Sequence, residues 1–371
     1  MTRKGGPYLP GTEWESLRNP WAVDNLVESP ILPPGSERVE LQRDGQYGIE
    51  AKIVGTLEDF TADLLPGTGE PGVIMPDYRI EGASHFGSFG YELDHCVVGS
   101  ASISGNGRLE ADLKTSRARR TATGERGPQA WLTAWYLNAH KGSLLYPRTV
   151  RQELEETYRR SRSYPEEETT FKGGGYLTIG GYAYVETPDL CFVLEHAPEE
   201  TEPSWSRNYA IEYREEWGGV PDEETRASIA NIVSFVMGRS LISVGHTSFD
   251  EQGRVIEEVA ISPRAQNDPV AACRRGEQPP VPLEKGRPTD GFEEVLSRLV
   301  PRYLALNKEL NLDDVLWGYW LYERLPLGDN LPVLSTSIEI LKKAWYSSKK
   351  SKSRGVYMCR RESSTSCCGR N

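Results

Sequence analysis

The sequence predicts an α+β fold, in which an antiparallel β-rich region precedes an incomplete helical domain. Residues 37–262 hold repeated runs of alternating apolar and polar residues between glycine-rich turns, which is typical of antiparallel strands. Residues 263–290 are rich in proline and predict a linker, and residues 291–348 change to helical spacing. The 371 residues suggest two or three domains, at roughly 100–200 residues per domain. Whether the β-rich region forms one lobe or two stays open.

Composition narrows the class of protein. A hydrophobic content of 37% with nine Trp and eighteen Tyr indicates a buried core. The net charge of −11 argues against bulk attraction to a polyanion, although a local basic patch could still bind nucleic acid. The absence of a long apolar run predicts no membrane partner, and the isolated Cys96, Cys191 and Cys273 are typical of reduced thiols. We therefore expect a cytoplasmic protein.

The first strands follow an extended lead-in. Residues 1–36 are rich in Pro and Gly, and we expect them to hold Trp14 and Trp21 against a neighbouring surface. Asp44–Gly45 then separates two alternating runs, which is the strongest short signal for a hairpin.

The middle of the chain is predicted to alternate between strands and polar connections. The strand-like segments read WLTAWYLNA, GYLTIGGYAYVE, LCFVLEHAP and NYAIEYREEW. Residues 120–129 are interpreted as a polar connection. Residues 149–171 are highly charged and poor in apolar side chains, so we expect an exposed helix or loop there.

One main helix is predicted near residues 222–238. Pro221 and Asp222 stand at its start, acidic residues fill its first turn, and apolar residues recur on one face. Residues 241–262 then read as a hairpin. In the helical region that follows the linker, Pro301 is expected to bend or break the first helix.

No complete catalytic or metal-binding motif is present. The five histidines lack zinc-ligand spacing and no Cys-x-x-Cys pair occurs, so neither a metal nor another cofactor is expected. Arg239 and His246 are separated by six intervening residues, a spacing that can bring an Arg and a His to one face of a helix. The intervening residues are strand-like, however, so we interpret the pair as a decoy. Glu339, among apolar neighbours, is a candidate site residue or an ordinary exposed helix charge. No paired-carboxylate signature supports a hydrolase built on the β-rich region.

Several stretches together carry a family resemblance. They are SERVELQRDGQYGIEAKIVGTLED, WLTAWYLNA, SWSRNYAIEYREEWGGVPDEE, IANIVSFVMGRSLISVGHTSFDEQGRV and WGYWLYERLPLGDNLPVLSTSIEILKKAWY. With them, the chain resembles bacterial proteins that join an ApeA-like N-terminal domain to a C-terminal HEPN-type helical domain.

The resemblance implies an antiphage or abortive-infection role and metal-independent RNA cleavage. It also implies RNA or a phage-derived trigger as a partner, and a homodimer formed through the helical domain. In such nucleases a His acts as general acid or base and an Arg offsets phosphate charge. This sequence departs from the pattern, because no His follows His246.

The last residues suggest a reason for that departure. Residues 349–371 are predicted to be a disordered tail, ending in a stretch that holds Cys367 and Cys368. If the gene is read in another frame, the codons of Cys367 and Cys368 contain a Leu codon. The codons of the tail then permit a sequence with the apolar spacing of a helix. The hypothesis is that a frame slip removed the rest of the helical domain, which leaves a chain that is inactive alone. The alternative is a non-enzymatic binding or sensor module with a β-rich recognition domain and a helical dimerisation segment.

Overall fold

The described part of the chain covers most of the sequence. The computed structural model describes residues 20–44, 47–56, 78–104, 106–139, 148–163, 166–196, 207–263, 288–322, 325–326 and 328–364.

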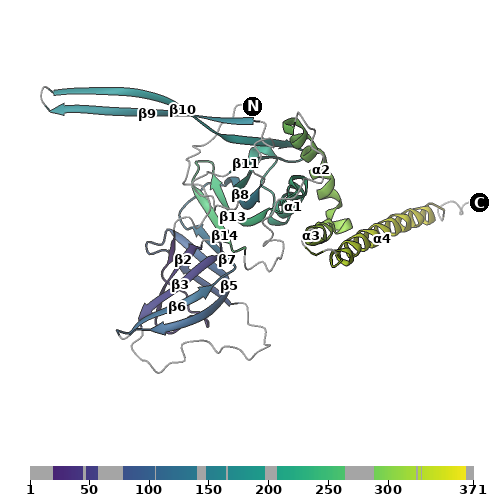
Figure 1. Ribbon diagram of the computed structural model, residues 1–371, viewed down its shortest axis with the longest axis horizontal. Coiled ribbons are helices and arrows are strands. Elements are labelled where there is room, and N and C mark those ends of the chain that lie inside the picture. The colour runs from purple at the N-terminus through teal and green to yellow at the C-terminus, as the bar shows by residue number, and fades with distance from the viewer. Residues whose placement is uncertain are drawn as a thin grey trace, which may run out of the picture.

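Strands dominate the first two thirds of the chain (Figure 1). In chain order they are β1 (Trp21–Val23), β2 (Ser36–Arg43), β3 (Ile49–Thr56), β4 (Tyr78–Ala83), β5 (Phe89–Ile103), β6 (Arg108–Lys114), β7 (Arg117–Ala122), β8 (Gln129–Ala139), β9 (Arg148–Ser163), β10 (Glu166–Glu186), β11 (Cys191–His196), β12 (Arg207–Arg214), β13 (Ile242–Asp250) and β14 (Val255–Ile261). All of their pairings are antiparallel. The α+β class, with a β-rich region before helices, is thereby confirmed.

The helices follow or cover this sheet. They are α1 (Glu223–Met237), α2 (Pro288–Leu310), α3 (Leu312–Tyr322) and α4 (Asn330–Ser364). Among the helices that the structure describes, none combines the length and apolar character that crossing a bilayer requires. In Figure 1, α4 projects away from the rest of the molecule, and the β9–β10 hairpin projects on the opposite side.

The strand order differs from the chain order at one important place. The sheet runs β1-β2-β3-β6-β5-β7-β14-β13-β8-β12-β11-β10-β9, with β4 beside β5. The β13–β14 hairpin, which follows α1, therefore lies between β7 and β8. Gly245 permits this packing, since its φ is +134° and an added Cβ would lie 1.8 Å from the carbonyl oxygen of Val259. The hairpin joins the two ends of the molecule into one sheet.

The N-terminal strands close into a ring. A bridge between Asp24 and Ala83 connects the end of β1 to β4, through backbone hydrogen bonds of 2.8 and 2.9 Å. Alternating residues of these strands point inward, including Leu41, Ile53 and Leu93, each fully buried. Strand periodicity thus explains why the first core forms inside the ring.

A second core lies between the sheet and the helices. Tyr209 and Tyr213 of β12 are fully buried there against Val233 of α1 and Phe292 of α2. The two cores use opposite faces of the sheet. Ala260 of β14 faces the ring, whereas its neighbour in sequence, Val259, pairs with His246 on the helix-covered face.

Local signals located the hairpins and α1 correctly. The predicted hairpins at residues 36–56 and 241–262 form, and α1 begins after Asp222, whose carboxylate accepts the Thr225 amide at 2.8 Å. The helix ends at Gly238, which has a φ of 69°. These elements are fixed by neighbouring residues, which explains why periodicity and capping predicted them.

The charged segment at residues 149–171 was predicted incorrectly. It forms β9 and the start of β10, instead of a helix or loop. Val150, Leu154 and Tyr158 recur every four residues, a spacing that fits one face of a helix and also one face of a strand. The connection at 120–129 is also shorter than expected, because β7 continues to Ala122.

Boundaries at both ends also differ from expectation. Trp21 belongs to β1, so part of the lead-in pairs with the sheet, while Trp14 lies outside the described residues. Most of the expected linker also lies outside them, and α2 begins at Pro288. The helix continues through Pro301 and does not break there.

The expected disordered tail is largely helical. The helix α4 reaches Ser364, so residues 349–364 correct that prediction, while Cys367 and Cys368 lie outside the described residues. Lys and Arg are frequent and Pro is absent in this stretch, which favours the end of a helix because cations there complement the helix dipole.

Candidate functional site

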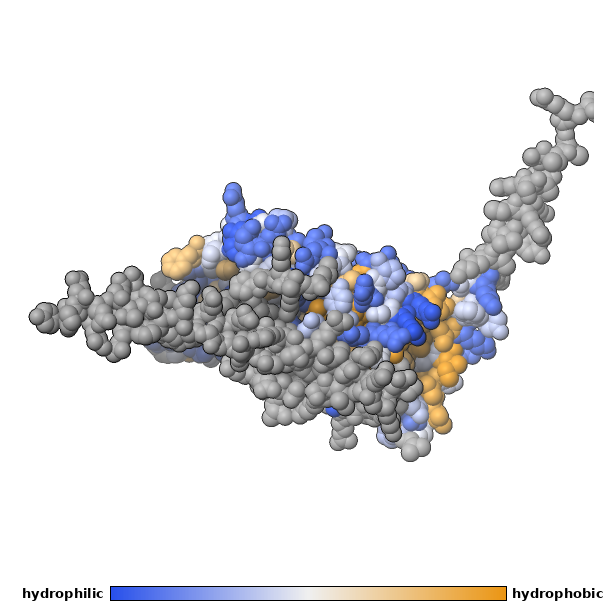
Figure 2. Space-filling model, turned by 90° about the horizontal axis from the view of Figure 1, so that it is seen from above, coloured by the Kyte–Doolittle hydropathy of each residue, from blue (hydrophilic) through white to orange (hydrophobic). Residues whose placement is uncertain are grey.

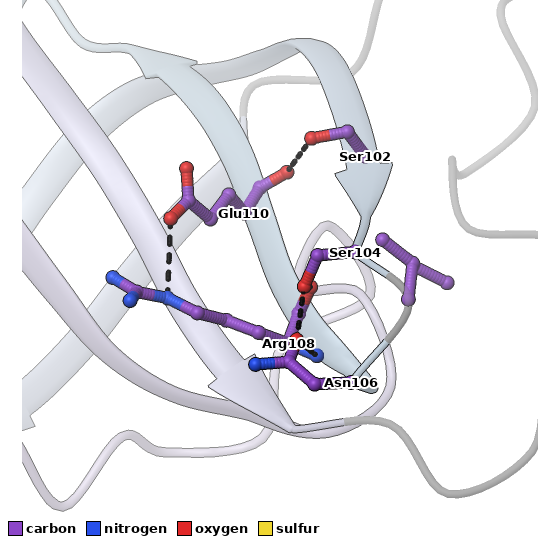
Figure 3. Close-up of a pocket in the computed structure, with 6 residues that line it drawn as sticks. Ser102, Ser104, Asn106, Arg108 and Glu110 are labelled. Carbon is purple, nitrogen blue, oxygen red and sulfur yellow. Dashed lines mark hydrogen bonds and ion pairs between the residues drawn. The ribbon is translucent and has the colours of Figure 1, made fainter.

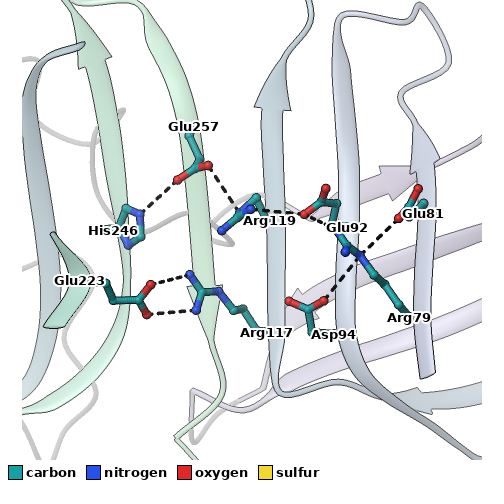
Figure 4. Close-up of polar contacts among 9 residues, drawn as sticks. All are labelled: Arg79, Glu81, Glu92, Asp94, Arg117, Arg119, Glu223, His246 and Glu257. Atoms are coloured by element: carbon teal, nitrogen blue, oxygen red, sulfur yellow. Dashed lines mark hydrogen bonds and ion pairs between the residues drawn. The ribbon is translucent and has the colours of Figure 1, made fainter. Parts of the chain in front are cut away.

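The sheet carries a row of charged side chains beside the start of α1. Figure 4 shows them side by side on the adjacent strands β4, β5, β7, β14 and β13 and at the start of α1. We call them the polar row: Arg79, Glu81, Glu92, Asp94, Arg117, Arg119, Glu223, His246 and Glu257. They share the sheet face that α1 and α2 cover further along, but here the face is polar.

Strand register explains the spacing of the polar row. Glu92 of β5 lies directly opposite Arg119 of β7, and Asp94 lies opposite Arg117. Arg119 lies 3.4 Å from Glu92 and also 3.4 Å from Glu257 of β14. Opposite charges on neighbouring strands stabilise such pairings, by roughly 0.2–1 kcal/mol each.

His246 is the most buried member of the row. It is only 7% exposed, and its Nε2 lies 3.3 Å from Glu257 Oε1. A carboxylate only accepts hydrogen bonds, so we assign the donated proton to Nε2. Burial lowers the pKa of His246, and the positive charge of Arg226 acts in the same direction. The Glu257 hydrogen bond opposes these effects, and the imidazole is neutral near pH 7.

The two carboxylates nearest to His246 are held in the ionised form. The hydrogen bond from His246, followed by the charge of Arg119, lowers the pKa of Glu257. Glu223, in the first turn of α1, accepts two hydrogen bonds from Arg117, each 3.0 Å long. This pair lowers the pKa of Glu223 and joins the helix start to the sheet.

A pocket opens above these groups, and we call it the α1 pocket. Its volume is about 260 Å³. The lining residues are Arg117, Arg119, Gln129, Leu132, Val220, Pro221, Asp222, Glu223, Arg226, His246, Ser248 and Glu257. Two groups that line the pocket could bind a further partner. Within the described residues, Arg226 has no ion pair and His246 Nδ1 has no hydrogen-bond partner.

This arrangement is better suited to binding an anion than to nucleophilic catalysis. Ser248 lies on the same strand face as His246, but within the described chain no hydrogen bond joins the two side chains. A nucleophile and its base would be within hydrogen-bond reach of one another. Guanidinium groups and an imidazole, by contrast, are common ligands of oxyanions.

The structure places the sequence candidates apart from one another. His246 lines the α1 pocket, whereas Arg239 follows the end of α1 and is not among the lining residues. Glu339 is exposed on α4 and lies 3.3 Å from Lys343, one helical turn later. Its environment is that of an ordinary surface helix charge.

Sequence reasoning missed the partners of His246. Arg117 and Arg119 alternate with Ala118 along β7, and Glu257 belongs to a short acidic pair in β14. The signal was the alternation of basic residues in RARR, which places Arg117 and Arg119 on one face of a strand. Pairing those strands with His246 required the sheet order, which no local pattern contains.

Other polar clusters have local structural explanations. Figure 3 shows a hollow at the β5–β6 turn, where Ser102, Ser104, Asn106, Arg108 and Glu110 bond to each other. Within the described residues, no cluster of three or more His, Cys, Asp and Glu side chains could hold a metal ion.

Comparison with known proteins assigns the chain to no family. No family model, curated protein or solved structure matches the chain.

Proposed function

We propose that this protein is a recognition module of an antiphage or abortive-infection system. In this proposal the β-rich region binds a trigger, and the helical segment pairs with a second copy of the chain. One observation carries the pairing: α4 has an exposed apolar face, although another of its faces already packs on the protein. The antiphage role and the trigger are what the sequence resemblance implies.

The packed face of α4 meets α3. Ser337 is buried, and a Cβ added to Gly318 of α3 would lie 1.9 Å from its hydroxyl oxygen. The two helices therefore approach closely along this face.

A second apolar stripe on α4 points elsewhere. We call it the α4 seam: Leu331, Leu334, Ile338, Leu341 and Trp345. Four of its members have exposed fractions between 36% and 62%. Figure 2 shows a band of hydrophobic residues beside the base of α4. The spacing alternates between three and four residues, as in the contact stripe of a coiled coil.

The α4 seam is self-complementary when two copies run antiparallel. With Ile338 at the centre, Leu331 of each copy faces Trp345 of the other. The same register brings the basic end of one helix, at Lys349, near Asp329 of the second copy. A parallel arrangement would instead place the basic ends together, so charge favours the antiparallel pair.

Oligomeric state tests the proposal. We expect sedimentation equilibrium of the full chain to give a dimer, and Ile338→Glu to give a monomer with unchanged circular dichroism. Thr336→Glu is the matched control, because it adds the same charge to an exposed position outside the α4 seam. A monomeric wild-type chain at micromolar concentration, or equal effects of the two substitutions, would refute pairing through this face.

RNA cleavage is the second candidate, because the resemblance implies it for full-length proteins of that class. The neutral His246 beside arginines is the observation that favours testing it on this chain. Since the chain has no histidine beyond His246, we expect no cleavage of single-stranded RNA by the purified protein. Cleavage that disappears in His246→Asn would instead assign the activity to the α1 pocket.

A further inference from the structure

The charges in the α1 pocket are unevenly paired. Arg117 is held by Glu223, and Arg119 lies between Glu92 and Glu257. Arg226 donates one hydrogen bond, from Nη1 to the carbonyl oxygen of Pro221 at 2.7 Å. Its remaining N–H groups have no carboxylate partner within the described residues. A guanidinium ion at a pocket wall is thus available to an external anion.

His246 supplies a second, independent feature. It is more than nine-tenths buried and lines the same pocket, yet only its Nε2 is hydrogen-bonded, to Glu257. The neutral ring leaves Nδ1 as an acceptor without a donor in the described chain. Nδ1 is not among the buried polar atoms without a partner, so a ligand in the α1 pocket can donate a hydrogen bond to it.

We propose that the α1 pocket binds a phosphate group between Arg226 and His246, and that Nδ1 takes up a proton as the phosphate binds. The proton comes from solvent or from a monoprotonated phosphate, and no covalent bond forms or breaks. Once protonated, Nδ1–H donates to a phosphate oxygen while Nε2–H still donates to Glu257. The negative ligand offsets the charge of Arg226, which otherwise disfavours the imidazolium ion.

The surrounding groups fit this coupling. The charged and amide side chains that line the pocket with His246 are Asp222, Glu223 and Arg226 from the start of α1, Arg117 and Arg119 from β7, Gln129 from β8 and Glu257 from β14. When His246 is neutral, the positive charges of three arginines balance the negative charges of three carboxylates in the pocket. A phosphate dianion adds two negative charges, and protonation of the imidazole compensates one of them. A volume of about 260 Å³ accepts a phosphate with part of an attached group.

The biological role of phosphate binding rests on the proposed recognition function, whereas phosphate binding itself can be measured independently of that function. The full chain, labelled with ¹³C-histidine, is titrated with inorganic phosphate, with adenosine monophosphate and with a short 5′-phosphorylated RNA. We expect one of the five histidine signals, absent in His246→Asn, to shift on addition and to titrate at a higher pH when phosphate is bound. Equal affinity for all three probes would identify the phosphate alone as the ligand, and tighter RNA binding would identify a phosphorylated end.

Matched variants make the test specific. Arg226→Gln should weaken binding at least tenfold, Arg226→Lys should retain part of it, and Arg298→Gln, on exposed α2 surface, should bind as wild type does. An unchanged His246 signal at millimolar phosphate, or wild-type affinity in Arg226→Gln, would overturn the proposal. Ile338→Glu should bind normally, so failure of helix pairing and failure of phosphate binding are separate results.

Discussion

Asp313 connects three helices, and its replacement by Ala should destabilise the helical layer strongly. Its carboxylate accepts hydrogen bonds from Asn231 of α1 at 2.6 Å, from Tyr303 of α2 at 2.5 Å and from Asn307 of α2 at 2.6 Å. Burial, assisted by this carboxylate, raises the pKa of Tyr303, so the hydroxyl stays protonated and continues to donate. Asp313 thus acts as the common acceptor of the helical layer.

The size of the effect follows from these contacts. A hydrogen bond to a charged group contributes about 1.5–3 kcal/mol, and three would give about 4.5–9 kcal/mol if they were independent. They share one half-buried carboxylate that water partly reaches, so we expect Asp313→Ala to cost about 3–4 kcal/mol. Asp314→Ala, in the same first turn of α3 but exposed, should lose only the helix-dipole interaction, about 0.5 kcal/mol.

Urea unfolding followed by tryptophan fluorescence measures the difference. Trp317 and Trp320 lie on α3, so the signal reports on the layer that Asp313 joins. The reasoning would be refuted if Asp313→Ala and Asp314→Ala moved the unfolding midpoint equally, since the hydrogen bonds would then contribute nothing beyond the dipole.

Two further predictions concern the sheet and the polar row. Gly245→Ala should lower the free energy of unfolding by about 3 kcal/mol or more, because the new Cβ would collide with the backbone. Gly90 has open space around it, so Gly90→Ala should change the free energy of unfolding by less than about 1 kcal/mol. Calorimetry of both variants checks this, and similar melting temperatures would contradict it. Glu223→Gln should lower the free energy of unfolding by about 0.5–1 kcal/mol at pH 7 after allowance for solvent screening. Because Arg117 holds the folded-state pKa of Glu223 below its usual 4.5, that deficit should persist above pH 4.5 and shrink as the pH falls through the folded-state pKa, as measured by urea unfolding at several pH values. A deficit that stayed constant down to pH 3 would exclude this ion pair as its source.

Elements fixed by adjacent residues could be predicted from the sequence. The Asp222 cap and Gly238 end define α1, and alternating residues define the hairpins. The β9–β10 segment was misread because its apolar residues repeat every four positions, which helix and strand share. Only pairing with a partner strand decides between them.

The candidate site was predicted only in part, for a different reason. His246 was considered, but beside Arg239, because the two are close in the sequence. Its actual neighbours, Glu257 and Arg119, come from two other strands. The order of strands in a sheet depends on long-range contacts, so the sequence could provide the residue types of the site but not their grouping.

The position of the β13–β14 hairpin sets an order of events during synthesis. Strands β7 and β8 are made early, but β13, the first of the two strands that separate them, begins only at Ile242, about 100 residues after β8 ends at Ala139. Until Ile261 has left the ribosome, the edges of β7 and β8 have no final partners on that side, and they could pair with each other or with another nascent chain. A proteolytic cut between residues 139 and 242 would therefore release an N-terminal fragment that contains its own ring but exposes an unpaired strand edge, and a pause in synthesis there would expose the same edge on the nascent chain.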